Sequence, residues 1–119
     1  MLELFDTCRS FLKIKKPVEF TLKPRIYRNC TGVHWAEVKD GKVLKHIIRI
    51  SYSRLAEDLR QFNTVLAHEF VHAWQAEYRP IRKKAHNKSF VKKALELEKY
   101  LIAMEFDVKD LYIPNIDTE

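Results

Sequence analysis

The residues of this chain best suited to chemistry are two histidines and a glutamate in the segment HEFVH, residues 68–72. On an α-helix, residues i and i+4 lie on one face about one turn apart, so the imidazoles of His68 and His72 can bind the same Zn²⁺ ion. A bound zinc ion lowers the pKa of water toward about 7, and Glu69 is placed to take up the proton as general base. The spacing therefore predicts a zinc-dependent hydrolase, and more specifically a peptidase that attacks a peptide carbonyl with water.

The residues around this motif are strongly apolar. Burying two histidines and a glutamate among them is unfavourable unless these polar groups bind a partner. Two surface histidines that happen to be four residues apart would not need such neighbours. A metal-bound pair is therefore the favoured interpretation, given the apolar residues that surround it: Val65, Leu66, Phe70, Val71 and Trp74.

A catalytic zinc ion usually has three protein ligands and a water molecule, so a third ligand is expected downstream. His86, which thirteen residues separate from His72, is the favoured candidate. Glu96 or Glu98 would replace it in a zinc site of the glutamate type. The upstream histidines are expected to be half-exposed strand residues, or groups that contact the ligands or the substrate: His34 and His46.

The spacing of apolar residues predicts an α+β fold in a single domain over residues 1–119. Its small three-stranded sheet is expected to be antiparallel or mixed, with the motif on one helix and the third ligand on another. Asp40 and Gly41 form the turn of the hairpin, and Asn63 could cap a new helix and split the motif helix in two. The expected elements are a helix over 2–13, strands over 18–22, 33–38 and 43–51, and helices over 54–78 and 88–105.

Composition narrows the class of protein. The chain has 119 residues, of which 46% are hydrophobic and 32% charged, as in ordinary globular domains. Its apolar stretches are far too short to span a membrane, and its N-terminus lacks the pattern of a signal peptide. We therefore expect a protein of the cytoplasm, nucleoid or nucleus, neither secreted nor in a membrane, with Cys8 and Cys30 as reduced thiols.

Four segments together resemble the SprT-like, or Spartan-type, metalloprotease domain. They are a hairpin ending in HIIRIS, the helix TVLAHEFVHAWQAEY, a basic loop, and AHNKSF at the start of the last helix. The resemblance covers roughly residues 30 to 100. It implies that His68, His72 and His86 bind one catalytic zinc ion, that Glu69 is the base, and that the fold is zincin-like.

The chain departs from the family pattern at Asn87, where the family commonly has glycine. Asparagine tolerates left-handed backbone conformations better than most residues and can also cap a helix, so the turn is expected to survive. Family members often carry a C-terminal zinc ribbon, and none is expected within residues 1–119.

The resemblance also implies a substrate, because such proteins cleave proteins attached to DNA or covalently trapped on it. The net charge of +6 is compatible with single- or double-stranded DNA as a partner. A solvated loop and helix face is the ordinary alternative. The cations expected to contact phosphates are Arg82, Lys83, Lys84 and Lys88.

Two further functions are compatible with the same residues. One is a zinc-stabilised module that binds DNA or protein with little or no peptidase activity, and the other is a small peptidase without a nucleic-acid partner. In zincins a peptide substrate commonly lies along a sheet edge, and strand 43–51 is the expected edge here.

Overall fold

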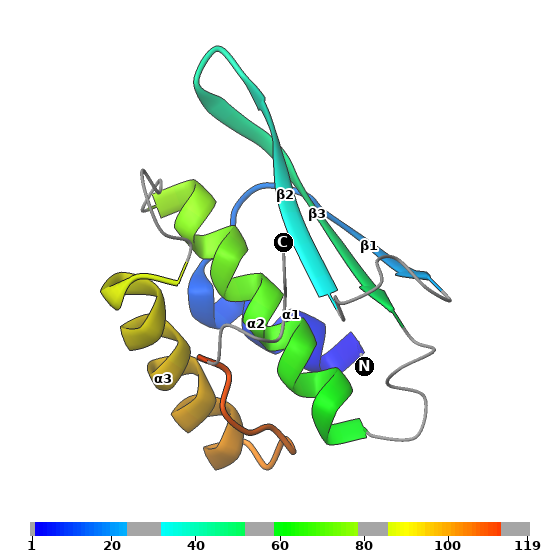
Figure 1. Ribbon diagram of the computed structural model, residues 1–119, viewed down its shortest axis with the longest axis vertical. Helices are drawn as coiled ribbons and strands as arrows, with labels where there is room; N and C mark the ends of the chain where they lie inside the picture. Colours follow the sequence, from blue (N-terminus) through cyan, green and yellow to red (C-terminus); the bar gives the residue numbers. More distant parts are fainter. Residues whose placement is uncertain (1, 24–31, 52–58, 79–85, 113–119) are drawn as a thin grey trace.

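The computed structural model describes residues 2–23, 32–51, 59–78 and 86–112. Within these ranges the chain forms three helices and a small mixed sheet, which confirms the predicted α+β class (Figure 1). None of the helices in this part of the chain is long and apolar enough to cross a membrane. In chain order the elements are α1 (Leu2–Leu12), β1 (Val18–Lys23), β2 (Gly32–Lys39), β3 (Lys42–Ser51), α2 (Leu59–Tyr78) and α3 (Lys88–Ala103).

The sheet has the strand order β1-β3-β2. Strands β2 and β3 are antiparallel around Asp40 and Gly41, whose φ values of 53° and 75° are the positive values that a tight hairpin turn requires. Strand β1 runs parallel to β3 on its other side. Because β3 is central and paired on both sides, the expectation that strand 43–51 forms the edge is wrong. Among the described strands, β2 is the edge beside α2.

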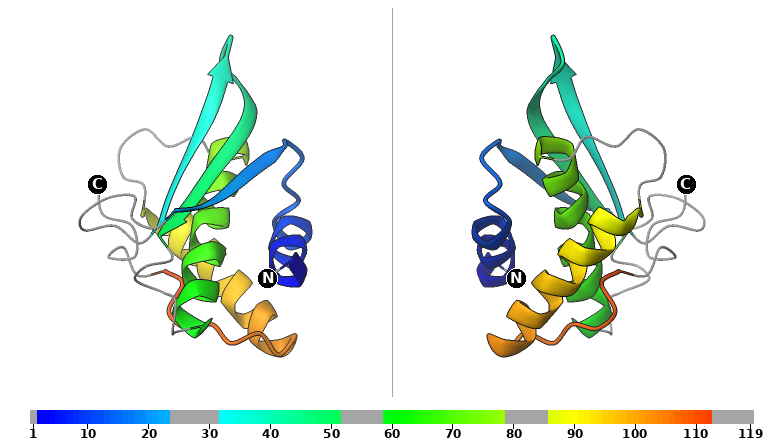
Figure 2. Two further views of the ribbon diagram at one scale, coloured as in Figure 1. Left: turned by 90° about the vertical axis from the view of Figure 1, so that its right-hand side faces the viewer. Right: turned by 90° about the vertical axis from the view of Figure 1, so that its left-hand side faces the viewer.

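The register of the strands places different side chains on the two faces of the sheet. Phe20, Ile48 and His34 lie side by side across the three strands. Figure 2 shows the sheet and the helices from two further sides. The three side chains face the helices, since Phe20 contacts Phe5 of α1 and the His34 ring lies beside that of His72 on α2. On this face β3 buries Ile48 completely. On the opposite face Trp35 is partly exposed, with the Arg49 guanidinium 4.8 Å from its ring. Side chains of alternate residues in β2 therefore point either toward the helices or away from them.

Helix α2 contacts β2, β3 and both other helices, so it is the centre of the fold. Phe70 on α2 meets Phe5 of α1 edge to face at 4.9 Å, and Phe5 contacts Phe20 of β1. The helix is continuous through Asn63, so the alternative in which Asn63 splits it in two is wrong. The Asn63 side chain donates a hydrogen bond to the carbonyl of Asp107 at 3.3 Å, and does not start a new helix.

The chain returns to the core after α3. The helix ends at Ala103, slightly earlier than expected, and Glu105 adopts a positive φ of 67° that turns the backbone. Val108 and Leu111 are then buried against the helices, and the Leu111 N–H donates to Glu98 Oε1 at 2.9 Å. This returning segment places the carbonyl of Leu111 beside α2. Cys8 is a free thiol in the same core, where burial raises its pKa.

Candidate metal centre

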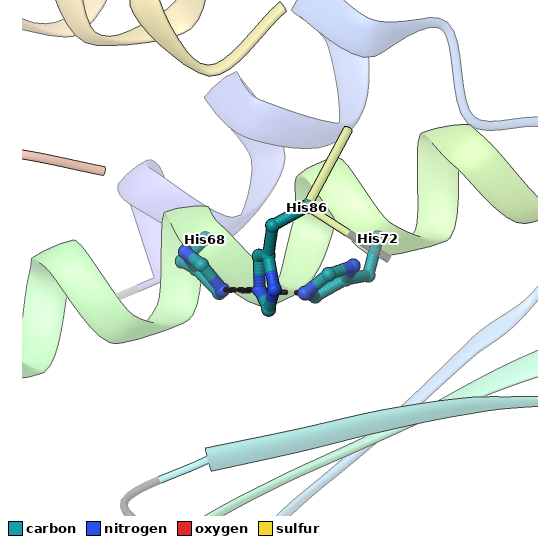
Figure 3. A group of neighbouring side chains, drawn as sticks. All are labelled: His68, His72 and His86. Carbon is teal, nitrogen blue, oxygen red and sulfur yellow. Dashed lines mark hydrogen bonds between the residues drawn. The ribbon is translucent and has the colours of Figure 1, made fainter. Parts of the chain in front are cut away.

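Three histidines meet at one point between α2 and the start of α3. His68 and His72 lie one turn apart on α2, and His86 comes from the turn before α3 (Figure 3). Nε2 of His68 is 3.2 Å from Nε2 of His72 and 3.2 Å from Nε2 of His86. One nitrogen from each ring lies within 4.8 Å of the other two. This is the geometry of a possible metal-binding group.

The positions of the Nδ1 protons on His68 and His72 indicate that a cation fits between the two Nε2 atoms. His68 Nδ1 lies 2.5 Å from the carbonyl oxygen of Leu111, and His72 Nδ1 lies 2.9 Å from Gln75 Oε1. Both oxygens only accept hydrogen bonds, so each Nδ1 carries a proton, and in the neutral form of each ring Nε2 has a lone pair. Two buried acceptors that face each other at 3.2 Å repel unless a cation or proton lies between them.

The spacing of the nitrogens also suits zinc. Tetrahedral ligands at about 2.0 to 2.1 Å from Zn²⁺ are separated from each other by about 3.3 to 3.4 Å. The two Nε2 separations of 3.2 Å from His68 are close to this value. Neutral imidazoles that donate their Nδ1 protons to oxygen acceptors are the usual form of zinc-binding histidines. The three residues therefore fit a zinc ion in both donor chemistry and spacing.

Phe90 of α3 packs against all three imidazoles. Its ring stacks on His72 with centroids 4.5 Å apart, and it meets His68 and His86 edge to face at 4.9 Å each. Phe90 itself is fully buried. Phe90 is the last residue of the AHNKSF segment that carries the family resemblance, and the structure indicates what it does: it limits the orientations of the three rings.

The turn that carries His86 is fixed by Asn87. The Asn87 side chain accepts a hydrogen bond from the Phe90 N–H at 3.0 Å, which makes it the N-cap of α3. Its φ is −80°, an extended conformation open to any residue, so a glycine is not required for backbone reasons. Of the two ways in which asparagine could replace glycine, the structure uses the cap.

Glu69 lies on α2 next to the start of the edge strand. Its side chain is fully buried. A β-carbon at position 32 would lie 3.1 Å from Glu69 Oε2 and only 2.6 Å from Val65 Cγ1. Gly32 thus allows the backbone of β2 to approach α2 closely, and any larger residue would displace the carboxylate or the strand.

The other candidate residues lie elsewhere. Glu98 accepts the hydrogen bond from Leu111, and Glu96 pairs with Lys93 at 3.0 Å, so neither glutamate joins the histidine group. Lys88 is exposed at the first residue of α3, beside His86. Three of the cations expected to contact phosphates fall outside the described residues: Arg82, Lys83 and Lys84.

A second polar group lies beside the metal centre. His34 Nε2 is 2.9 Å from His46 Nδ1, and His46 Nε2 is 2.9 Å from Glu77 Oε1. Glu77 also accepts hydrogen bonds from the backbone N–H groups of Lys15 at 3.1 Å and Lys16 at 2.9 Å. His46 is fully buried, which corrects the expectation of a half-exposed strand residue.

Glu77 was not among the candidates from the sequence, although a signal for it exists. It follows the buried Phe70 by seven residues, or about two helical turns, and so lies on the same face of α2. A carboxylate in line with a core residue indicates a buried partner, here His46.

The charges of this second group follow from its contacts. Burial raises the pKa of Glu77, but the backbone hydrogen bonds from Lys16 and Lys15 and the contact with His46 lower it by more, so the carboxyl is ionised. Burial lowers the pKa of His46 more than Glu77 raises it, so this imidazole is neutral near pH 7. The pair is a neutral histidine that donates to a carboxylate.

The sequence was compared with family models, curated proteins and solved structures. Neither the curated proteins nor the solved structures gave a match. The family model described as the SprT-like family matches residues 2–110, which includes every described helix and strand and the three converging histidines. The chain therefore belongs to the SprT-like family, as the resemblance of its motifs had implied.

Proposed function

We propose that this protein is a zinc-dependent metalloendopeptidase. The observation that carries the proposal is the convergence of one nitrogen from each of three imidazoles within 4.8 Å, with a fully buried glutamate on the helix that holds two of them. When bound, zinc would polarise the peptide carbonyl and lower the pKa of water. Membership of the SprT-like family supports the same activity.

The chain's own residues have separate roles in this proposal. His68, His72 and His86 hold the ion. Nδ1 hydrogen bonds orient the rings of His68 and His72, and Phe90 packs against all three. Glu69 takes the proton from the attacking water and passes it to the leaving amine. Its burial beside Gly32 keeps bulk water away from the carboxylate, which favours proton transfer to the substrate.

The peptide is proposed to lie along β2, the edge strand of the described sheet. Added as a further strand, it would make hydrogen bonds through its backbone, which requires little of its side chains. Strand β2 contacts α2, and Gly32 brings the strand against Glu69. A peptide on this edge would pass beside both the base and the metal ligands. This arrangement rests partly on analogy with zincins.

DNA-associated proteins are the proposed substrates. The net charge is +6, and α3 begins beside His86 with Lys88. Lys92 and Lys99 follow at i+4 and i+11, on the same side of the helix, and all three lysines are exposed. Such a row could bind phosphates in a sequence-independent way. Replacing the three lysines by glutamine should weaken DNA binding and reduce its salt dependence.

Cleavage of a DNA-binding protein by the zinc-loaded chain tests the proposal. The assay is run without DNA, with single-stranded DNA and with double-stranded DNA, beside Glu69→Gln and a chelator. Glu69→Gln should retain one equivalent of zinc and lose about 10²- to 10⁴-fold in rate, the usual contribution of a general base. Glu96→Gln, which changes an exposed carboxylate on α3, is the matched control and should cleave at the normal rate.

The outcomes separate the activity from its partner. Cleavage that depends on Glu69 and zinc but not on DNA would support a peptidase without a nucleic-acid role. Zinc bound at one equivalent with no Glu69-dependent cleavage under any condition would contradict the peptidase proposal. A zinc-stabilised binding module would then be the better description, and salt-sensitive DNA binding would identify it.

A further inference from the structure

Three titratable side chains outside the metal ligands form a hydrogen-bonded chain through the fold. It runs from Glu77 on α2 to His46 on the central strand and then to His34 on the edge strand, with both links 2.9 Å long. The side chain of His46 is fully buried and that of Glu77 is 6% exposed. Burying such groups is unfavourable unless each is paired, so a fold retains them at some expense in stability.

The chain of hydrogen bonds has one direction. Glu77 is an ionised acceptor, because two backbone N–H groups also donate to it. His46 must therefore donate from Nε2, and as a neutral ring it accepts at Nδ1. His34 donates from Nε2 into that acceptor. The Glu77 carboxylate thus fixes the tautomer of His46 and the orientation of the His34 ring.

His34, the last member of this series of hydrogen bonds, lies beside the metal centre. The rings of His34 and His72 are nearly parallel, at 17°, with centroids 6.4 Å apart. His34 is only partly buried, unlike His46. It lies two residues after Gly32, on the same face of β2, and Gly32 is where the strand meets Glu69. His34, the half-buried end of this series of hydrogen bonds, therefore lies beside a proposed metal ligand and on the strand proposed to bind the peptide.

We propose that His34 contacts the peptide bound at the metal centre, and that His46 and Glu77 are positioning residues that hold its ring in one orientation. This inference rests on the proposed peptidase function and adds to it a substrate-binding residue from the sheet. The contact is to the peptide group at or next to the bond that is cleaved, because His34 lies on the edge strand and its ring is beside that of His72 on α2.

A purely architectural role would predict something different. In that case the hydrogen bonds between Glu77, His46 and His34 would only hold the sheet against α2. Their loss would lower the stability of the fold without a selective effect on ligand affinity. His34→Phe separates the two roles, because phenylalanine keeps a ring beside His72 and removes both nitrogens. Trp35→Phe is the matched control, since Trp35 is the next residue of β2 and faces away from the helices.

The test measures ligand affinity and does not depend on turnover. Two probes bind the zinc-loaded protein: acetohydroxamate, which needs little beyond the metal, and N-acetyl tetraalanine with a phosphinate group in place of its central peptide bond. Dissociation constants are measured for the wild type, His34→Phe, His46→Phe, the double variant and Trp35→Phe. Zinc affinity and the thermal unfolding midpoint are measured for each.

The expected result is a selective loss. His34→Phe should weaken phosphinate binding by at least about tenfold, with acetohydroxamate and zinc affinity within about twofold of the wild type. His46→Phe should weaken phosphinate binding by a smaller factor. It should add nothing in the His34→Phe background, because a positioning residue acts only through the residue that it positions.

Other results would overturn the inference. These are unchanged phosphinate affinity in His34→Phe, an equal loss for both probes, an effect of Trp35→Phe as large as that of His34→Phe, or no phosphinate binding by the wild type. Failure of the peptidase proposal is visible separately in the cleavage assay. If Glu69→Gln cleaves like the wild type while His34→Phe still loses phosphinate affinity, Glu69 is not the base and the His34 contact stands.

Discussion

Two groups of buried or partly buried histidines lie side by side in this molecule, and their nitrogen atoms are arranged in different ways. In the metal centre, Nε2 atoms that carry lone pairs face each other at 3.2 Å, between His68 and His72. In the chain from Glu77 to His34, donors and acceptors alternate at 2.9 Å. The first group offers nitrogen atoms that a cation can bridge, whereas in the second each donor has an acceptor within the group. Imidazoles of one fold thus form a possible metal-binding group in one place and a hydrogen-bonded support in the other.

The largest expected effect comes from removing a metal ligand. His72→Ala should lower zinc affinity by more than about 100-fold, because even the loss of an outer hydrogen bond to a ligand typically costs about 10- to 100-fold. Stabilisation of the fold by added zinc should disappear with it. Competition with a chromophoric chelator measures the affinity. His46→Phe, in the other group, should bind zinc within about twofold of the wild type, and a comparable loss there would contradict the distinction between the groups.

Phe90 offers a second test, because its ring packs against His68, His72 and His86. Phe90→Ala should reduce the free energy of unfolding by about 3 to 5 kcal/mol, as for other buried aromatic residues, and should also weaken zinc binding. Leu97→Ala removes another fully buried side chain of α3, about two helical turns beyond Phe90. It should lower stability by about 2 to 5 kcal/mol and leave zinc affinity unchanged. Urea unfolding and zinc titration of both variants make the comparison.

The two groups also differ in how well the sequence predicts them. The HEFVH spacing is local and sets the positions of His68 and His72 as soon as the segment is helical, and His86 follows at the next helix start. The hydrogen bonds that link Glu77, His46 and His34 form only because the strand that carries His46 is central in the sheet. Local alternation cannot show that β1 pairs with β3 in parallel and moves β2 to the edge, since strand order is a tertiary property. The carbonyl of Leu111 depends equally on the return of the chain after α3.

Acidification should affect the second group in a predictable direction. The pKa of His46 is lowered in the folded state, first by burial and also by the charge of Arg9, and that of Glu77 is lowered by its hydrogen bonds. Groups with lowered pKa values stabilise the fold above their unfolded pKa and lose that contribution as the pH falls toward the folded value. For His46 the loss begins below its ordinary value of 6.5, and for Glu77 below 4.5.

Urea unfolding with chelator present, at pH 7.5 and pH 5.5, measures this effect. The wild type should lose more stability between the two pH values than His46→Phe, which has no imidazole to protonate at that position. His34, His68, His72 and His86 are present in both proteins, so the difference reports on His46 and its hydrogen bonds with Glu77 and His34. Equal losses would show that His46 is not held neutral by the fold.

The smallest expected effect concerns the turn that presents His86 to the other ligands. Asn87→Ala removes the acceptor for the Phe90 N–H and should lower the free energy of unfolding by about 1 kcal/mol. Asn87→Gly, which restores the residue common in the family, should cost only a few tenths of a kcal/mol, because glycine is itself a tolerable N-cap. Thermal unfolding of the zinc-free variants measures both. If alanine and glycine were equivalent, the cap would contribute little, and the packing of Phe90 alone would account for the position of His86.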